Sequence, residues 1–82
     1  MAHILIVEDD INLGQILFQE LKRHNHDVEL VENGEAAFGR MNKYIYDLML
    51  TDLKLPGMDG IELLKKVKGL SLSTIVIVMT GY

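Results

Sequence analysis

The sequence predicts an α/β domain built on an open parallel sheet, and the alternation of two kinds of segment along the chain carries that prediction. Short apolar runs rich in β-branched residues alternate with amphipathic helical patterns, in the order strand, helix, strand, helix, strand, helix, strand. This alternation is typical of parallel strands joined by right-handed crossovers, with helices on both faces of the sheet. The length of 82 residues leaves room for one domain with a modest core.

The first strand and the first helix are the clearest elements of the N-terminal half. Residues 4–7 are Ile, Leu, Ile and Val without alternation, as expected of a central strand covered on both faces. A helix is predicted from about residue 11 to residue 24, because leucines at four-residue spacing form an apolar stripe. Asp10 occupies its N-cap position, and Asn25 is a plausible terminator.

The next two elements are a strand and a short helix. Residues 27–32 alternate charged and apolar side chains, which predicts a strand at the edge of the sheet with one solvated face. The Asn33-Gly34 pair ends this strand, and a helix follows through residue 41. Gly39 weakens that helix, because glycine in a helix interior costs about 1 kcal/mol relative to alanine.

Turn and cap signals divide the C-terminal half. A third strand ends at Asp52 and leads into a loop with a Pro-Gly pair at residues 56–57. Asp59 and Glu62 form a capping-box-like pair at the start of a third helix, and Gly69 is placed to end it. Residues 74–79 form the fourth strand.

The composition excludes several classes of protein. With 49% hydrophobic and 24% charged residues the chain is globular, and its apolar runs are too short to span a bilayer. The absence of cysteine excludes disulfides and thiolate metal sites. A net charge of -4 argues against sequence-independent binding of nucleic acid. No signal peptide precedes the first strand, so we expect a soluble protein of the cytoplasm with no membrane partner.

Acidic side chains follow the ends of two predicted strands. Glu8 and Asp9 come directly after the first strand, and Asp52 closes the third. Ligands in open parallel sheets bind at the carboxyl ends of the strands, so these carboxylates are expected to share one site. Like charges so close are unfavourable unless a cation offsets them, and Mg²⁺ is the expected ion. A carboxylate beside it can attack a phosphoryl group, and the Thr80 hydroxyl could donate to a phosphoryl oxygen.

Simpler interpretations cover some of the polar residues. Capping of the first helix accounts for Asp10, whereas Asp52 precedes a loop with no immediate helix start. The three histidines show no spacing typical of a zinc site, and we interpret them as incidental.

Three segments of the chain resemble the receiver domain of two-component response regulators: ILIVEDD at residues 4–10, DLMLTDLKLPGMDG at residues 47–60 and IVIVMTG at residues 75–81. The second segment is highly specific. The resemblance implies a flavodoxin-like α/β fold, a three-layer arrangement whose parallel sheet would have four strands in the order 2-1-3-4 with three helices.

The resemblance also assigns roles to individual residues. Asp52 would accept a phosphoryl group from a histidine kinase or a phosphotransfer protein. Glu8 and Asp9 would form the acidic pair, and the backbone carbonyl of Lys54 would complete the Mg²⁺ shell. Thr80 would be the switch hydroxyl. The magnesium phosphatases that also form an aspartyl phosphate are a competing class. Their sequence pattern has a second acid two residues after the nucleophile, and this chain has Lys54 at that position.

A receiver continues after its fourth strand with a helix, a fifth strand that ends in a lysine, and a final helix. The resemblance therefore implies that residues 1–82 are the N-terminal portion of a receiver. Such a phosphoacceptor is not an enzyme, although it can catalyse its own phosphorylation, and loss of the lysine-bearing strand would impair that reaction. The fourth strand would be an uncharged, β-branched edge, a template for pairing with another chain. The alternative function is thus a non-phosphorylated interaction module that forms homo-oligomers through this strand or through exposed apolar surface.

Overall fold

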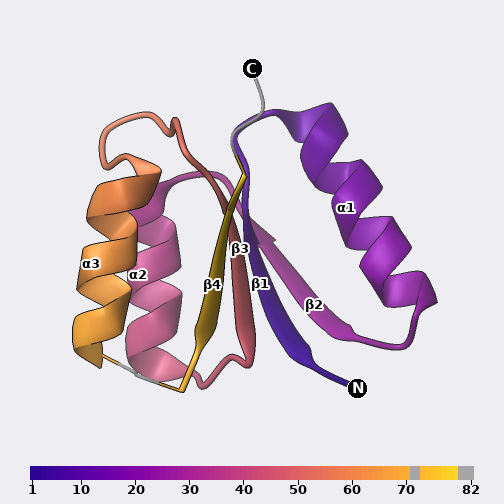
Figure 1. Cartoon of the computed structure of the whole chain (residues 1–82). Helices are drawn as coiled ribbons and strands as arrows, with labels where there is room; N and C mark the ends of the chain where they lie inside the picture. The colour runs from indigo at the N-terminus through magenta and orange to yellow at the C-terminus, as the bar shows by residue number, and fades with distance from the viewer. Residues whose placement is uncertain (71–72, 80–82) are drawn as a thin grey trace.

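The chain folds into a parallel sheet between two helical layers (Figure 1). The structure, a computed structural model, describes residues 1–70 and 73–79. In chain order the elements of this part are β1 (His3–Val7), α1 (Ile11–Arg23), β2 (Asp27–Val31), α2 (Gly34–Lys43), β3 (Leu48–Asp52), α3 (Gly60–Leu70) and β4 (Ile75–Met79).

The sheet has the strand order β2-β1-β3-β4, and every neighbouring pair is parallel. Helix α1 covers one face, and α2 and α3 lie side by side on the other (Figure 1). The prediction of a flavodoxin-like α/β fold with the order 2-1-3-4 and three helices is confirmed for the described residues. None of these helices is long and apolar enough to cross a membrane.

Strand β1 divides its side chains between two cores, because successive residues of a strand point to opposite faces. Leu5 and Val7 belong to the core beneath α2 and α3, whereas Ile4 and Ile6 belong to the core beneath α1. All four side chains are buried, as predicted for a central strand. Burial on both sides fixes the register of β1, and therefore the place at which its C-terminal end emerges.

The helix caps largely follow the sequence signals. The Asp10 carboxylate accepts the Leu13 amide hydrogen at 3.1 Å, and Asn25 ends α1 with a φ of 67°. The Asp59 carboxylate accepts the Glu62 amide hydrogen at 2.8 Å. Gly69 was predicted to end α3 and does not, since the helix continues to Leu70. Among the described residues, a Cβ at Gly69 would meet nothing within 4 Å, so this position leaves room for a side chain.

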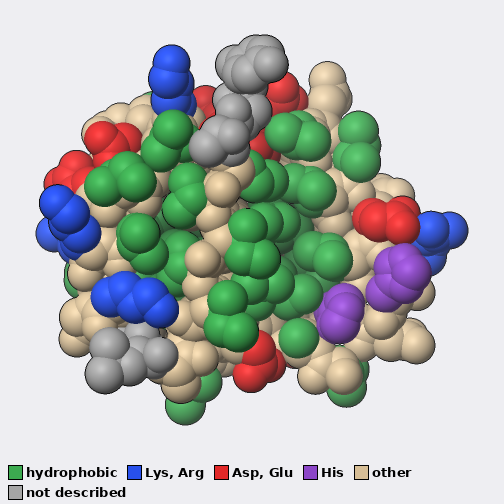
Figure 2. Space-filling view, in the orientation of Figure 1, with side chains coloured by type: hydrophobic (Ala, Val, Ile, Leu, Met, Phe, Trp, Pro, Cys, Tyr) green, Lys and Arg blue, Asp and Glu red, His purple; other side chains and the backbone are tan. Residues whose placement is uncertain are grey.

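Strand β4 lies at an edge of the sheet among the described residues. On one face its Ile75 and Ile77 side chains are 64% and 47% exposed, and we call these two residues the β4 patch. On the other face Val76 packs against the core beneath α2 and α3. Figure 2 shows apolar side chains gathered over this part of the sheet and towards α1.

Strand β2 lies at the opposite edge, as predicted, but one of its charged residues is engaged in hydrogen bonds within the protein. Glu29 is half-buried and accepts hydrogen bonds from the Arg40 guanidinium and the Tyr46 hydroxyl. Its other oxygen lies 3.3 Å from Nε2 of His3, so these four residues form a polar cluster. The interpretation of His3 as incidental was therefore wrong. Its ring packs on Tyr46, with the two centroids 4.2 Å apart.

The pKa values in the polar cluster are shifted by these contacts. Burial alone would lower the pKa of His3, but the hydrogen bonds to Glu29 and to the Ile45 carbonyl raise it above its ordinary value of 6.5, as does the charge of Asp27. Burial raises the pKa of Tyr46 to about 12, with a further contribution from Glu29. Burial would also raise the pKa of Glu29, but its hydrogen bonds outweigh burial and lower it below 4.5.

The polar cluster gives a prediction for the pH dependence of stability. Both ring nitrogens of His3 face oxygen acceptors, 2.8 Å away at Ile45 and 3.3 Å away at Glu29, so the imidazolium suits the site better than the neutral ring. The raised pKa means that this stabilisation is fully present below pH 6.5 and is lost as pH rises through the folded-state pKa. The lowered pKa of Glu29 works in the opposite sense, since its stabilisation is lost as pH falls below 4.5.

We expect the wild-type chain to lose about 0.5–1 kcal/mol of unfolding free energy through His3 as pH rises from about 6 to about 9. Urea unfolding at several pH values measures this loss. His3→Gln should remove it, whereas His24→Gln should keep it, because His24 is exposed and its ring lies outside the polar cluster, 3.2 Å from the exposed Glu20. Equal pH slopes for wild type and His3→Gln would contradict the assignment.

Candidate functional site

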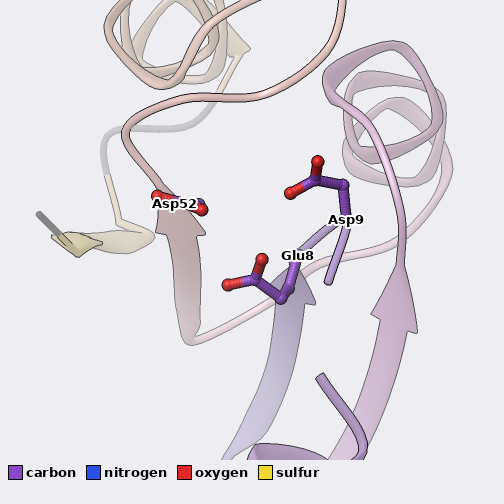
Figure 3. Close-up of side chains that lie close together, drawn as sticks. All are labelled: Glu8, Asp9 and Asp52. Carbon is purple, nitrogen blue, oxygen red and sulfur yellow. The ribbon is translucent and has the colours of Figure 1, made fainter. Parts of the chain in front are cut away.

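Three carboxylates meet at the C-terminal edge of the sheet. Glu8 and Asp9 directly follow β1, and Asp52 is the last residue of β3. One carboxylate oxygen from each residue lies within 4.8 Å of the others. Figure 3 shows the three side chains converging above the ends of the two strands. The structure thus brings together the acidic residues that the sequence placed at one site.

Backbone hydrogen bonds between neighbouring strands hold these residues in place. The Glu8 amide donates to the Val31 carbonyl of β2 at 3.0 Å, so the chain stays in the sheet for one residue beyond β1. Asp52 stands opposite Met79 of β4, and the Leu53 amide donates to the Met79 carbonyl at 2.9 Å. The carboxylates of Glu8 and Asp52 therefore project from backbone that is paired within the sheet, and Asp9 directly follows Glu8.

Glu8 is the most confined of the three, with 2% of its surface exposed. Its Oε2 accepts the Asp10 amide hydrogen at 3.0 Å, while the buried Oε1 has no hydrogen-bond partner among the described residues. Burial raises the pKa of Glu8, the Asp10 amide partly offsets this, and the charges of Asp52 and Asp9 raise it further. A buried carboxylate oxygen without a partner is costly. A bound cation would satisfy it, so the donor set fits a metal ion.

The other two carboxylates are more open to solvent. Asp9 is exposed and Asp52 is half-buried. Mg²⁺ favours oxygen ligands and usually keeps several of its waters, which requires an open side to the site. One buried and two accessible carboxylates match that requirement, and an approaching phosphoryl group could reach Asp52 from the open side.

The remaining predicted site residues have different outcomes. Lys54 is exposed, and its backbone nitrogen lies 3.4 Å from Oδ1 of Asp52. The ligand role of its backbone carbonyl stays a prediction. Thr80 lies outside the described residues, so its role as a switch hydroxyl also stays a prediction. Asp10 caps α1 and is not part of the acidic cluster, in agreement with the simpler interpretation.

Gly60 was given no role by the sequence analysis. The structure places its amide 2.8 Å from the carbonyl of Leu53, the residue between Asp52 and Lys54. The only sequence signal was a glycine directly after the helix cap Asp59, a position at which glycine is not required for capping.

A family model described as the response regulator receiver domain matches residues 4–82. The chain belongs to the receiver domain family of response regulators. The match includes all three acidic residues of the site, and it covers the described helices and strands except for His3, the first residue of β1.

Relatives of this receiver are longer regulatory proteins. The transcriptional regulatory protein ZraR of Klebsiella oxytoca is 39% identical over 79 residues, which are 96% of this chain and 18% of ZraR. The response regulator ArlR of Staphylococcus aureus is 35% identical over 78 residues, which are 95% of this chain and 36% of ArlR. This receiver therefore spans well under half of the length of either relative.

Solved structures have the same fold as this receiver. The response regulator TrrA of Thermotoga maritima, in complex with Mg(2+)-BeF, matches with a TM-score of 0.93 and 30% identity. That match covers 100% of this chain and 71% of the TrrA chain. A second structure holds TrrA in complex with the histidine kinase ThkA, and it matches with a TM-score of 0.92.

Proposed function

We propose that this receiver is a phosphoacceptor of a two-component system, with Asp52 as the residue that takes the phosphoryl group. The convergence of Glu8, Asp9 and Asp52 carries the proposal, because it places a solvent-accessible carboxylate beside two further acids and an unsatisfied buried oxygen. The complexes of TrrA with Mg(2+)-BeF and with a histidine kinase support Mg²⁺ as the ion and a histidine kinase, or a phosphotransfer protein, as the donor.

Each residue of the site has its own role in this proposal. Glu8, Asp9 and Asp52 would hold the Mg²⁺ ion, and the backbone carbonyl of Lys54 would be a further ligand. When bound, the ion supplies positive charge against the carboxylates and the phosphoryl oxygens. An oxygen of the Asp52 carboxylate attacks phosphorus, and the phosphorus–nitrogen bond of the donor phosphohistidine breaks. The electron pair passes to the imidazole nitrogen, which takes up a proton, and Asp52 carries an acyl phosphate. Thr80 then donates to a phosphoryl oxygen.

The test is phosphate uptake from a small acyl phosphate. The 82-residue chain is incubated with acetyl phosphate and Mg²⁺, beside the same chain extended by the part of TrrA that the structural match leaves uncovered. We expect the intact mass to increase by one phosphate group with Mg²⁺ and to stay unchanged with a chelator. If neither chain takes up phosphate while both are folded by circular dichroism, the proposed function is wrong.

The β4 patch favours a second candidate function, an interaction module that forms homo-oligomers. The outer edge of β4 has no strand partner in the described structure, and the patch exposes two isoleucines beside that edge. An uncharged β-branched edge can pair with the same edge of a second copy, and pairing would cover the exposed side chains.

Light scattering over a range of concentrations measures this self-association. We expect the mass of the 82-residue chain to rise with concentration, and Ile77→Lys to weaken association by about tenfold or more, because lysine at a strand edge opposes pairing. Ile45→Lys is the matched control, since Ile45 is 83% exposed and lies outside β4. A monomer mass at every concentration would rule the candidate out.

A further inference from the structure

The first residue of α3 lies directly against the C-terminal end of β3. A Cβ built on Gly60 would lie 2.4 Å from the carbonyl oxygen of Asp52 and 2.9 Å from Cα of Leu53. Real Cβ atoms essentially never approach other atoms so closely, and both of these are backbone atoms. Gly60 is thus required for space, because only a residue without a side chain lets α3 start at this point.

This close approach affects the backbone on both sides of Leu53. The Leu53 carbonyl accepts the Gly60 amide hydrogen at 2.8 Å, and the Leu53 amide donates to Met79 of β4 at 2.9 Å. Leu53 is therefore held from both sides, by the start of α3 and by β4. Asp52 precedes it and Lys54 follows it, so the contact with α3 sets the backbone that carries the carboxylate and the carbonyl of the site.

We propose that Gly60 is a positioning residue for the phosphoacceptor site: its lack of a side chain lets the start of α3 fix the backbone at residues 52–54. The inference rests on the proposed function and adds to it a residue that touches neither phosphate nor metal ion. Gly14 illustrates the difference, because a Cβ there would meet the ends of the Leu30 side chain at 3.2 Å, a longer contact that involves no backbone atom. The backbone of Asp52 can yield only if the site moves with it.

Gly60→Ala tests the inference, with Gly69→Ala as the matched control on the same helix. Among the described residues a Cβ at Gly69 would meet nothing within 4 Å, so both variants add one methyl group to α3 but only Gly60→Ala presses on the site. We expect Gly60→Ala to weaken Mg²⁺ binding by about tenfold or more, as changes beside metal ligands do. Phosphate uptake should fall by about 100-fold, since a displacement of about 1 Å can cost that much. Gly69→Ala should match wild type in both.

The readouts separate a role in the site from a role in stability. Mg²⁺ affinity is measured by titration calorimetry, and uptake by intact mass at saturating Mg²⁺, both at a temperature at which circular dichroism shows each variant folded. The same change is also made in a Gly39→Ala background. A Cβ at Gly39 would meet nothing within 4 Å in the described part of the chain, so alanine should strengthen α2 and help to keep the Gly60 variant folded.

Each outcome bears on the inference. Weaker Mg²⁺ binding and slower uptake by a folded Gly60→Ala chain support it. Wild-type values for that chain overturn it while leaving the proposed function intact, whereas a wild-type chain that neither binds Mg²⁺ nor takes up phosphate overturns the proposed function. Loss of the whole fold in both backgrounds would also overturn the inference, because Gly60 would then be required by the fold and not by the site.

Discussion

Replacing Asp52 by asparagine is expected to reduce phosphate uptake by at least about 10³-fold, because an amide cannot act as the nucleophile that a carboxylate provides. Intact mass after incubation with acetyl phosphate and Mg²⁺ measures the effect. The substitution nearly preserves the size of a half-buried side chain, so the fold should survive. The variant also retains Glu8 and Asp9, so weak Mg²⁺ binding can persist while uptake is lost.

Asp47→Asn is the matched control for Asp52→Asn. Asp47 lies directly before β3, at the opposite end of that strand from Asp52, and its Oδ2 accepts the His3 amide hydrogen at 2.8 Å. An asparagine can still accept this hydrogen bond through its side-chain oxygen, so the fold and the uptake should both be retained. Similar uptake by wild type and Asp52→Asn would mean that another residue is the acceptor.

The second large effect concerns stability with and without Mg²⁺. At a concentration 100-fold above its dissociation constant, Mg²⁺ should raise the unfolding free energy of wild type by about 2.7 kcal/mol, measured by urea unfolding. Asp9→Asn should lose most of this gain, because one of the three converging carboxylates is removed. Without Mg²⁺ the same variant should be at least as stable as wild type, since the charge of Asp9 no longer opposes those of Glu8 and Asp52.

Asp10→Asn provides the control for this experiment. Asp10 neighbours the site in sequence but caps α1, and asparagine is about as good an N-cap as aspartate. Its stabilisation by Mg²⁺ should equal that of wild type. The account would be contradicted if Asp10→Asn lost the Mg²⁺ effect and Asp9→Asn kept it, because the ion would then bind elsewhere.

The sequence was sufficient to predict features that depend on local pattern. The uninterrupted apolar run of β1 identified a central strand, and caps at Asp10 and Asp59 located two helix starts within one residue. The convergence of Glu8 with Asp52 followed from a general property of parallel sheets, whose strand ends share an edge. These predictions needed no knowledge of which side chains touch.

Features that depend on pairing between distant segments could not be predicted in the same way. Glu29 looked solvated because β2 alternates. In the fold it stands opposite Leu5, and it accepts hydrogen bonds from Arg40 of α2 and from Tyr46 of the segment between α2 and β3. The role of Gly60 depends on how the loop between β3 and α3 returns the chain to the end of β3. The Pro-Gly turn signal alone does not fix that path. In both cases the role of the residue depends on tertiary contacts that its local sequence pattern does not indicate.

The most direct test of the account is to locate the phosphoryl group on the chain. After incubation with acetyl phosphate and Mg²⁺, borohydride reduces an aspartyl phosphate to homoserine, and peptide mass spectrometry then identifies the modified residue. The account predicts modification at Asp52 alone, and only when Mg²⁺ is present. Modification at another aspartate, or at Asp52 to the same extent with a chelator, would contradict the claim that the three converging acids bind an ion beside a nucleophilic carboxylate.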